Sequence, residues 1–361
     1  MEKIKKSDHF YLIDGSGYIF RAYYALPPLT RKSDGLPVGA VSGFCNMLFK
    51  LLEDSKSDDN LEKPTHFAVI FDSARKNFRN EIYSEYKGNR SDAPDDLIPQ
   101  FEYIRKSVKA FNLPSIELIN YEADDLIATY VEKILDLGAK VTIVSSDKDL
   151  MQLYKKGVRI YDPMKNKFIN QDDVHNKFGV TPEKVIDVQS LAGDSTDNVP
   201  GVPGIGVKTA AELINQYGTL ENLLKNASKI KQNKRRETLI DNKDDAIISK
   251  KLDTLKKQFP NTLHTLEWHH PNFTPTDSDF CIEQSFSIRA DMYNVIGVPH
   301  SQWNGAYTYP EGGAGGGRSS QAGQRAQARG ARGHSQGPGC SAPAALPPRV
   351  SSSSRSHDQG V

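Results

Sequence analysis

Three short apolar runs, each followed closely by an aspartate, occur in the first half of the chain. They are His9–Ile13 before Asp14, Phe67–Phe71 before Asp72, and Lys140–Ser146 before Asp147 and Asp149. Segments long enough to be helices, such as Val38–Leu52 and Phe101–Phe111, lie between the runs. Buried strands that alternate with helices predict an α/β domain built on a parallel sheet.

These aspartates share one position relative to the predicted strands. A single aspartate after a strand is usually a turn residue or a helix cap. In an open α/β sheet, however, functional groups collect beyond the carboxyl ends of the strands. Because all three runs end in this way, we expect their aspartates to converge on one crevice.

A further acidic cluster precedes an apolar helical segment between the second and third runs. It comprises Glu122, Asp124 and Asp125. If Glu122 opens a helix, Glu122 and Asp125 share one face, three residues apart. Acids in a first helical turn are also stabilised by the helix dipole, which is a purely structural explanation. The mutual repulsion of three crowded acids favours the alternative, in which they bind a divalent cation.

The segment Leu191–Ala211 combines two features. Asp194 and Asp197 lie three residues apart and can present two carboxylates to one hard cation. A glycine-rich loop that can approach a phosphate closely follows, with a helix opening behind it. The residues of this loop and helix start are Gly201, Gly204, Gly206, Lys208 and Thr209. The purely structural alternative is a turn between two helices with solvated acids. The combination of paired acids and a phosphate-binding loop instead suggests an enzyme acting on a nucleic-acid backbone.

Basic and aromatic side chains are interleaved between Arg75 and Arg90. They are Arg75, Lys76, Phe78, Arg79, Tyr83, Tyr86, Lys87 and Arg90. Such a stretch can neutralise phosphates and stack on unpaired bases. A solvated amphipathic helix would show the same pattern, so the stretch alone leaves both interpretations open. A loop is predicted directly after it, at residues 91–96.

Beyond Asp149 the pattern changes from strands to short helices. The predicted helices are Gln171–Phe178, Pro182–Ala192, Lys208–Tyr217, Leu220–Asn226 and Asp244–Leu255. We therefore expect a domain boundary near Tyr161–Asp172, with a catalytic domain at residues 1–170 and a helical domain at residues 171–290. The lysine-rich run Lys231–Arg236 is either a solvated surface or a DNA contact.

The composition changes again after about Pro260. No lysine follows Lys257, and from Glu311 the chain consists mainly of Gly, Ala, Ser, Gln, Arg and Pro. Such a segment can bury little apolar surface, which predicts a disordered tail at residues 291–361. The change from lysine to arginine usage suggests that a frameshift or a fusion produced this end of the chain.

Composition excludes several classes of protein. The 361 residues carry a formal net charge of +1, so affinity for nucleic acid must come from local basic patches. Cys45, Cys281 and Cys340 form no Cys-x-x-Cys pair, which argues against a disulfide framework or a zinc site and fits a reducing cytoplasm. The sequence has no signal peptide and no apolar run of the roughly 18–20 residues that span a bilayer. We expect a soluble, cytoplasmic protein without a membrane partner.

A series of motifs follows in order along residues 8–260. They are Leu-Ile-Asp14-Gly-Ser-Gly, Phe-Arg21-Ala-Tyr, Val-Ile-Phe-Asp72, Tyr86-Lys87-Gly-Asn-Arg90, Tyr-Glu122-Ala-Asp124-Asp125, Ser-Ser-Asp147-Lys-Asp149, Gly-Asp194-Ser-Thr-Asp197-Asn and Gly-Val-Pro-Gly-Ile-Gly-Val-Lys208-Thr-Ala. In combination they resemble the bacterial 5′–3′ exonuclease, or flap endonuclease, family, most closely the N-terminal nuclease domain of DNA polymerase I. No common fold unit supplies all of these motifs in this order.

The resemblance implies a PIN-like α/β domain with two divalent ions, Mg²⁺ or Mn²⁺, in a cluster of acids. It also implies a helix–three-turn–helix DNA-binding domain, with a K⁺ ion at its loop. The family's metal-site acids match Asp14, Asp72, Glu122, Asp124, Asp125, Asp147, Asp149, Asp194 and Asp197. The basic arch over the active site matches Arg79, Lys87 and Arg90, which are expected to be catalytic. The expected DNA-binding residues are Arg21, Tyr86, Gly201, Gly204, Gly206, Lys208 and Thr209.

The expected activity is metal-dependent hydrolysis of DNA phosphodiester bonds in replication and repair. The substrate would be DNA with a 5′ flap, a nick or an RNA primer end, bound by a monomer. Two features depart from the family, because the sequence has no polymerase or proofreading domain and the family pattern is lost after about Phe280. The alternatives are a non-catalytic module that binds DNA structures and a truncated gene product. The full set of acids favours the enzyme.

Overall fold

Strands and helices alternate along the chain as its apolar pattern predicts. The computed structural model describes residues 4–57 and 62–255. The strands are β1 (His9–Asp14), β2 (His66–Ile70), β3 (Ser115–Ile116), β4 (Lys140–Val144), β5 (Val158–Asp162) and β6 (Lys167–Ile169). The α-helices are α1 (Gly15–Ala25), α2 (Gly39–Ser57), α3 (Arg79–Ile82), α4 (Ile98–Ala110), α5 (Ala123–Asp136), α6 (Gln171–Phe178), α7 (Val185–Ala192), α8 (Val207–Tyr217), α9 (Leu220–Lys225), α10 (Asn233–Asp241) and α11 (Lys243–Asp253). The 3₁₀ helices in these ranges are η1 (Asp149–Leu153), η2 (Pro182–Lys184) and η3 (Ala227–Lys229).

In the described part of the chain, the six strands form one sheet in the order β3-β2-β1-β4-β5-β6. The central strand β1 pairs in parallel with β2 on one side and with β4 on the other. The edge strand β6 is antiparallel to β5, so the sheet is mixed at this edge. Only residues 163–166 connect these two strands, and such a short connection cannot make the crossover that parallel pairing needs.

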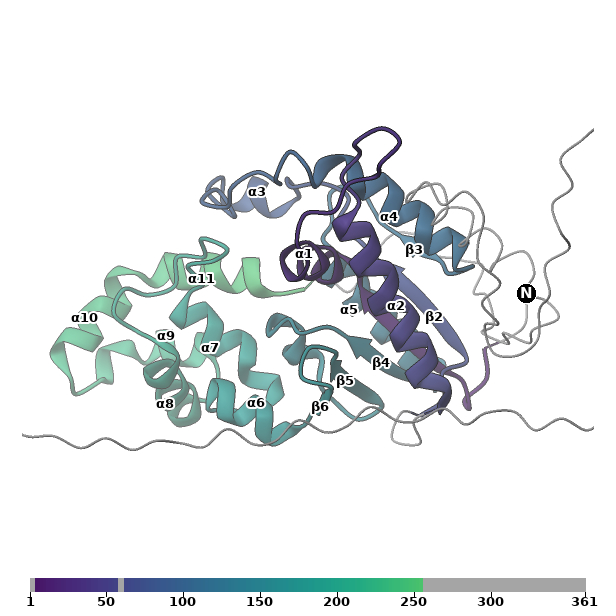
Figure 1. The fold of residues 1–361 in the computed structure, drawn as a ribbon. Coiled ribbons are helices and arrows are strands. Elements are labelled where there is room, and N and C mark those ends of the chain that lie inside the picture. Colours follow the sequence, from purple (N-terminus) through teal and green to yellow (C-terminus); the bar gives the residue numbers. More distant parts are fainter. Residues whose placement is uncertain (1–3, 58–61, 256–361) are drawn as a thin grey trace, which may run out of the picture. The chain divides into compact units, whose positions relative to one another are not determined.

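Both faces of the sheet are covered, and the side chains of β1 alternate between two cores. Tyr11 and Ile13 belong to a cluster that includes side chains of α1, α2 and α4. Phe10 and Leu12 belong to a second cluster with α5 and the helices that follow β6. Figure 1 shows α2 and α4 beside the sheet, with α5 behind it. Because both faces are buried, β1 is apolar without interruption from Phe10 to Ile13 rather than alternately polar.

Two helices begin at predicted acids. Asp14 precedes α1, and its Oδ1 accepts a hydrogen bond of 2.9 Å from the Gly17 N–H. Glu122 precedes α5, and its N–H donates to Asp125 Oδ2 over 3.2 Å. The helix predicted to open at Glu122 is therefore present. Free N–H groups at these helix starts stabilise nearby carboxylates.

The boundary predicted near residue 170 falls between β6 and α6. One hydrophobic cluster nevertheless continues across it and contains Ile127 of α5, Val188 of α7 and Leu239 of α10. The helical part therefore packs directly on α5 and that face of the sheet. The rest of the predicted helical domain, residues 256–290, and the predicted tail, residues 291–361, lie outside the described residues. Within the described ranges, no helix is long and apolar enough to cross a membrane.

A buried histidine at the start of β1 predicts how stability depends on pH. Burial lowers the pKa of His9 from its ordinary value of 6.5 to about 4, and its Nε2 lies 2.8 Å from Thr142 Oγ1. His9 is therefore protonated near pH 6.5 in the unfolded chain but only near pH 4 in the folded chain. This contribution to stability is complete above pH 6.5 and is lost as the pH falls towards 4, by up to roughly 1.4 kcal/mol per pH unit.

We expect His9→Asn to make the free energy of unfolding less dependent on pH between 6.5 and 4.5 than in the wild type. Urea unfolding at several pH values measures this slope. His175→Asn, at an exposed position of α6, is the matched control. Identical slopes for the wild type and His9→Asn would contradict the prediction.

Candidate active site

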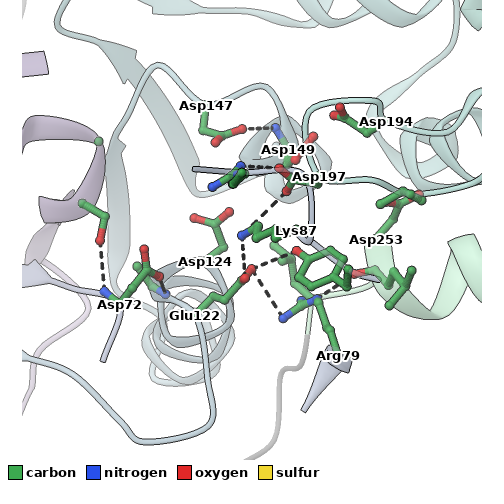
Figure 2. Close-up of a pocket in the computed structure, with 18 of the residues that line it drawn as sticks. Asp72, Arg79, Lys87, Glu122, Asp124, Asp147, Asp149, Asp194, Asp197 and Asp253 are labelled. Carbon is green, nitrogen blue, oxygen red and sulfur yellow. Dashed lines mark hydrogen bonds and ion pairs between the residues drawn. The ribbon is translucent and has the colours of Figure 1, made fainter. Parts of the chain in front are cut away.

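A cavity of about 200 Å³ opens where β1, β2 and β4 end. Its acidic lining residues are Asp14, Asp72, Glu122, Asp124, Asp147, Asp149, Asp194, Asp197 and Asp253. Its cationic lining residues are Arg79, Lys87 and Arg90. Figure 2 shows acids from several segments of the chain around this cavity, with Lys87 between Glu122 and Asp197. The cavity thus carries a large excess of negative charge.

The sheet brings together acids that are far apart in the sequence. Asp14 ends β1, Asp72 follows β2, and Asp147 follows β4. The Ser145 hydroxyl donates to Asp14 Oδ2 over 2.8 Å. The Ala123 N–H, at the start of α5, donates to Asp72 Oδ1 over 2.7 Å. These contacts fix the carboxylates at the edge of the sheet where the sequence predicted a crevice.

Several of these acids are costly to ionise. Burial, reinforced by Asp72 and Asp147, raises the pKa of Asp14 to about 6. Burial and the charge of Asp147 likewise raise the pKa of Asp149 to about 6. Burial, together with Asp147 and Asp14, raises the pKa of Asp124 well above its ordinary value. A bound cation would relieve both the desolvation and the repulsion.

Other acids of the cavity are paired with side-chain cations. The pairs are Lys87 with Glu122, Arg90 with Asp197 and Lys148 with Asp194. Lys87 Nζ lies 2.5 Å from Glu122 Oε1 and 3.7 Å from Asp197 Oδ2. Although burial opposes it, Lys87 and Arg79 lower the pKa of Glu122.

The donor set fits a hard divalent cation, because every acid that lines the cavity offers oxygen ligands. Their arrangement is looser than a closed metal site. Among residues 4–57 and 62–255, no three side chains of His, Cys, Asp or Glu are positioned to hold one metal ion. Lys87, Arg90 and Lys148 neutralise part of the acidic set instead.

Hydrogen bonds join the basic stretch to a turn formed by Asp194–Val199, which closes on itself through a β-bridge. The bonds are the Lys87 N–H to Asp197 O (2.8 Å), Asn89 Nδ2 to Ser195 O (2.6 Å) and Asn198 Nδ2 to Glu85 O (2.7 Å). Lys87 has a φ of 54°, a left-handed conformation that costs roughly 1–2 kcal/mol for a residue other than glycine. The bonds hold this conformation and aim Lys87 at Glu122.

Comparisons with known proteins agree with this geometry. Residues 9–179 match the family described as 5′–3′ exonuclease, N-terminal resolvase-like domain. Residues 180–274 match the 5′–3′ exonuclease, C-terminal SAM fold. A 5′–3′ exonuclease of Buchnera aphidicola is 37% identical over 261 residues, which cover 71% of this chain and 89% of that protein. The chain belongs to the 5′–3′ exonuclease family.

Two further proteins resemble this chain in sequence or in fold. DNA polymerase I of Rhizobium leguminosarum is 58% identical over 258 residues, which cover 72% of this chain and 25% of that protein. The chain therefore spans about a quarter of the length of this relative. T5 5′-exonuclease, solved with zinc ions bound, is 21% identical with a TM-score of 0.58, covering 79% of this chain and 99% of the T5 chain. At this identity, the likeness to the T5 enzyme shows the fold alone.

In this chain, Asp125 and Arg79 have a different arrangement from the predicted one. Both oxygens of Asp125 accept hydrogen bonds from Arg79, over 2.7 and 2.8 Å, and Asp125 is fully buried behind the cavity lining. Arg79 is itself 1% exposed and donates through Nε to Leu252 O. The carboxylate of Asp125 is thus already neutralised, and we assign the pair to structure rather than to metal binding or catalysis.

Two of the three aromatic side chains of the basic stretch, Phe78 and Tyr86, are buried and therefore not available for base stacking. Tyr86 is 5% exposed, its hydroxyl donates to Glu122 Oε2, and its ring packs with Val199 and Leu252. Phe78 is buried against Tyr121. The stretch forms only the short helix α3 and turns, so the solvated amphipathic helix is not present, and of its aromatic side chains only the half-buried Tyr83 could still contact a base.

The glycine-rich loop divides into a buried and an open part. Gly201 is buried, its N–H donates to Ser249 Oγ, and a Cβ there would lie 2.4 Å from the Gly193 nitrogen. Gly201 therefore serves packing and has no N–H free for a phosphate. Gly204, Gly206 and Lys208 are exposed.

The remaining predicted DNA contacts lie on separate helices. Thr209 is half-buried on α8, and Arg21 is exposed on α1.

Sequence analysis missed one acid of the cavity, Asp253. It is the last residue of α11, in a helix where acidic and basic residues alternate without a motif. Burial, with the charges of Asp149 and Asp194, raises its pKa well above the ordinary value. No local signal in the sequence marks Asp253, because only the return of α11 to the sheet brings it to the cavity.

Two adjacent acids at the start of α5 should have opposite effects on stability. Asp125→Asn leaves Arg79 buried with an incomplete partner, which should lower the free energy of unfolding by about 3–5 kcal/mol. Asp124→Asn removes a buried, repelled carboxylate and should raise the free energy of unfolding of the metal-free protein at pH 8 by about 1 kcal/mol or more. Chemical denaturation in EDTA measures both. Equal destabilisation by the two substitutions would contradict the division of roles.

Proposed function

We propose that this chain is a divalent-metal-dependent 5′ nuclease that hydrolyses phosphodiester bonds in DNA with a 5′ flap or a nick. The observation that carries the proposal is the single cavity lined by nine carboxylates and three cations, in a chain of the 5′–3′ exonuclease family. The match covers only 25% of the related DNA polymerase I, so the proposal concerns only the nuclease part of such a protein.

We assign the metal-binding role to two groups of acids. Asp124, Asp147 and Asp149 are not positioned to hold one ion by direct contact alone, so they would bind one Mg²⁺ or Mn²⁺ ion partly through water, assisted by Asp14, Asp72 and Glu122. Asp194 and Asp197 would hold a second. When bound, such ions provide a hydroxide nucleophile near neutral pH and stabilise the charge on the leaving oxygen.

The basic side chains would exchange partners when DNA binds. Lys87 and Arg90 now neutralise Glu122 and Asp197. A phosphate is an equally good partner for either cation, so a scissile phosphate near the acids can attract both. Their charge would then stabilise the negative charge that develops on the phosphate oxygens. The ion pairs seen without DNA thus keep the two cations at the place where the phosphate arrives.

The open part of the glycine loop would bind the duplex away from the cut. Gly204 and Gly206 have no atom within 4 Å of an added Cβ position, so a phosphate can approach their backbone closely. Lys208 lies in the first turn of α8, where N–H groups and the helix dipole favour an anion. A K⁺ ion shared between this loop and a phosphate, and action as a monomer, remain predictions.

The decisive experiment uses a 5′-labelled flap duplex incubated with the purified protein. We expect release of the flap in Mg²⁺ or Mn²⁺ and no cleavage in EDTA. A matching duplex without the flap or nick is the control substrate. Tight flap binding without cleavage at any concentration of either ion would favour the non-catalytic alternative.

Lys87→Ala and Lys208→Ala should separate chemistry from binding. Lys87→Ala should slow single-turnover cleavage by about 100-fold, because a cation next to the phosphate is lost. Lys208→Ala should weaken duplex affinity and reduce the slope of its salt dependence by about one, with little change in the saturated rate. Single-turnover rates and salt titrations on one flap substrate measure both effects. Similar effects of the two substitutions on both quantities would count against this division of labour.

A further inference from the structure

Asp253 enters the acidic cavity without a partner of its own. It ends α11, lines the cavity with the predicted acids, and lies beside them in Figure 2. Its Oδ2 is buried and accepts no hydrogen bond. Within the described residues, Asp253 forms no ion pair, whereas Asp125, Asp194 and Asp197 each have a cation. A buried carboxylate oxygen without a hydrogen bond or an ion pair lowers the stability of the folded protein unless a cation binds to it.

The side chains around Asp253 supply acceptors and no free donor. Gln152 Nε2 donates to the carbonyl oxygens of Asp149 and Asp253, over 2.9 and 3.2 Å. Gln189 Nε2 donates to Asp149 Oδ1 over 2.5 Å. The amide oxygens Gln152 Oε1 and Gln189 Oε1 are buried without a hydrogen bond, as is Asp253 Oδ2. Two of these unpaired oxygens belong to glutamines that donate to Asp149, and the third belongs to Asp253. All three are acceptors, so a cation with its water is a suitable partner for them.

The position of Asp253 is fixed by the rest of the fold. Arg79 Nε donates to the carbonyl oxygen of Leu252 over 2.8 Å, and the Leu252 side chain packs with Tyr86 and Val199. Arg79 also donates one hydrogen bond from each terminal nitrogen to Asp125, so its charge is already matched. The end of α11 is thus held firmly against the cavity while its carboxylate stays uncompensated.

We propose that Asp253 is an additional metal-centre carboxylate, which helps to hold the divalent ion assigned to Asp124, Asp147 and Asp149, directly or through a water bound to that ion. The inference rests on the proposed function, because the ion is one of the two assigned to the nuclease. It extends the acidic set beyond the residues that the family motifs identify. It also explains why a half-buried acid, with one buried carboxylate oxygen, is tolerated at the end of a helix, where the dipole disfavours negative charge.

The test compares Asp253→Asn with the wild type in Mn²⁺ binding without DNA, followed by electron paramagnetic resonance. Asp253→Asn keeps the volume of the side chain and removes its charge. We expect the affinity for one Mn²⁺ ion to fall about tenfold or more. We also expect the metal-free variant to melt at a higher temperature than the wild type and to gain less from added Mn²⁺. Asp244→Asn, at the exposed start of the same helix, makes the same charge change far from the cavity and should leave the Mn²⁺ affinity unchanged.

Two outcomes would overturn the role of Asp253. Mn²⁺ affinities that agree within twofold would show that the carboxylate does not contribute to the ion. A metal-free melting temperature several degrees below the wild type would show that Asp253 serves the fold. A wild type that binds Mn²⁺ but leaves flap DNA intact would contradict the proposed nuclease activity alone, since the comparison of affinities would still hold.

Discussion

Repulsion among carboxylates is the constraint on which the described structure depends. The parallel strands deliver aspartates to one edge of the sheet, and the Asp194–Val199 turn and the end of α11 add more. Such a concentration of buried negative charge opposes folding. It is offset by N–H groups at the starts of α1 and α5 and by cations from other segments. The negative charge that remains without a partner would attract divalent metal ions.

The acids fall into two groups by their partners. Asp14, Asp124 and Asp149 face one another's charge and have raised pKa values. Glu122 and Asp194 are paired with lysines, which, against the effect of burial, lower the pKa values of both acids. The first group is suited to bind an ion immediately. Each acid of the second group must release its lysine before it can bind a metal ion, which couples metal binding to the positions of Lys87 and Lys148.

The pair of Arg79 and Asp125 connects three segments that meet at the cavity. Arg79 begins α3, Asp125 lies in the first turn of α5, and the Arg79 guanidinium also binds the carbonyl oxygen of Leu252 near the end of α11. A buried ion pair contributes little net stability after desolvation, but breaking it is costly. Its value here is geometric, because it sets where the basic stretch and Asp253 lie relative to the acids.

The sequence by itself determined the strands β1, β2 and β4, most of the helices and the convergence of Asp14, Asp72 and Asp147, because apolar runs and parallel-sheet topology are local or general rules. It did not predict the edge-side strands β3, β5 and β6. Tertiary structure alone decided which acids line the cavity without a side-chain cation as partner. Asp124 and Asp125 are neighbours in the chain, yet one faces the cavity and the other faces Arg79. Asp253 carries no motif and reaches the cavity only because α11 returns to it. The sequence gives the position of each charged residue along the chain, whereas the ion pairs, burial and pKa of that residue depend on contacts between distant segments.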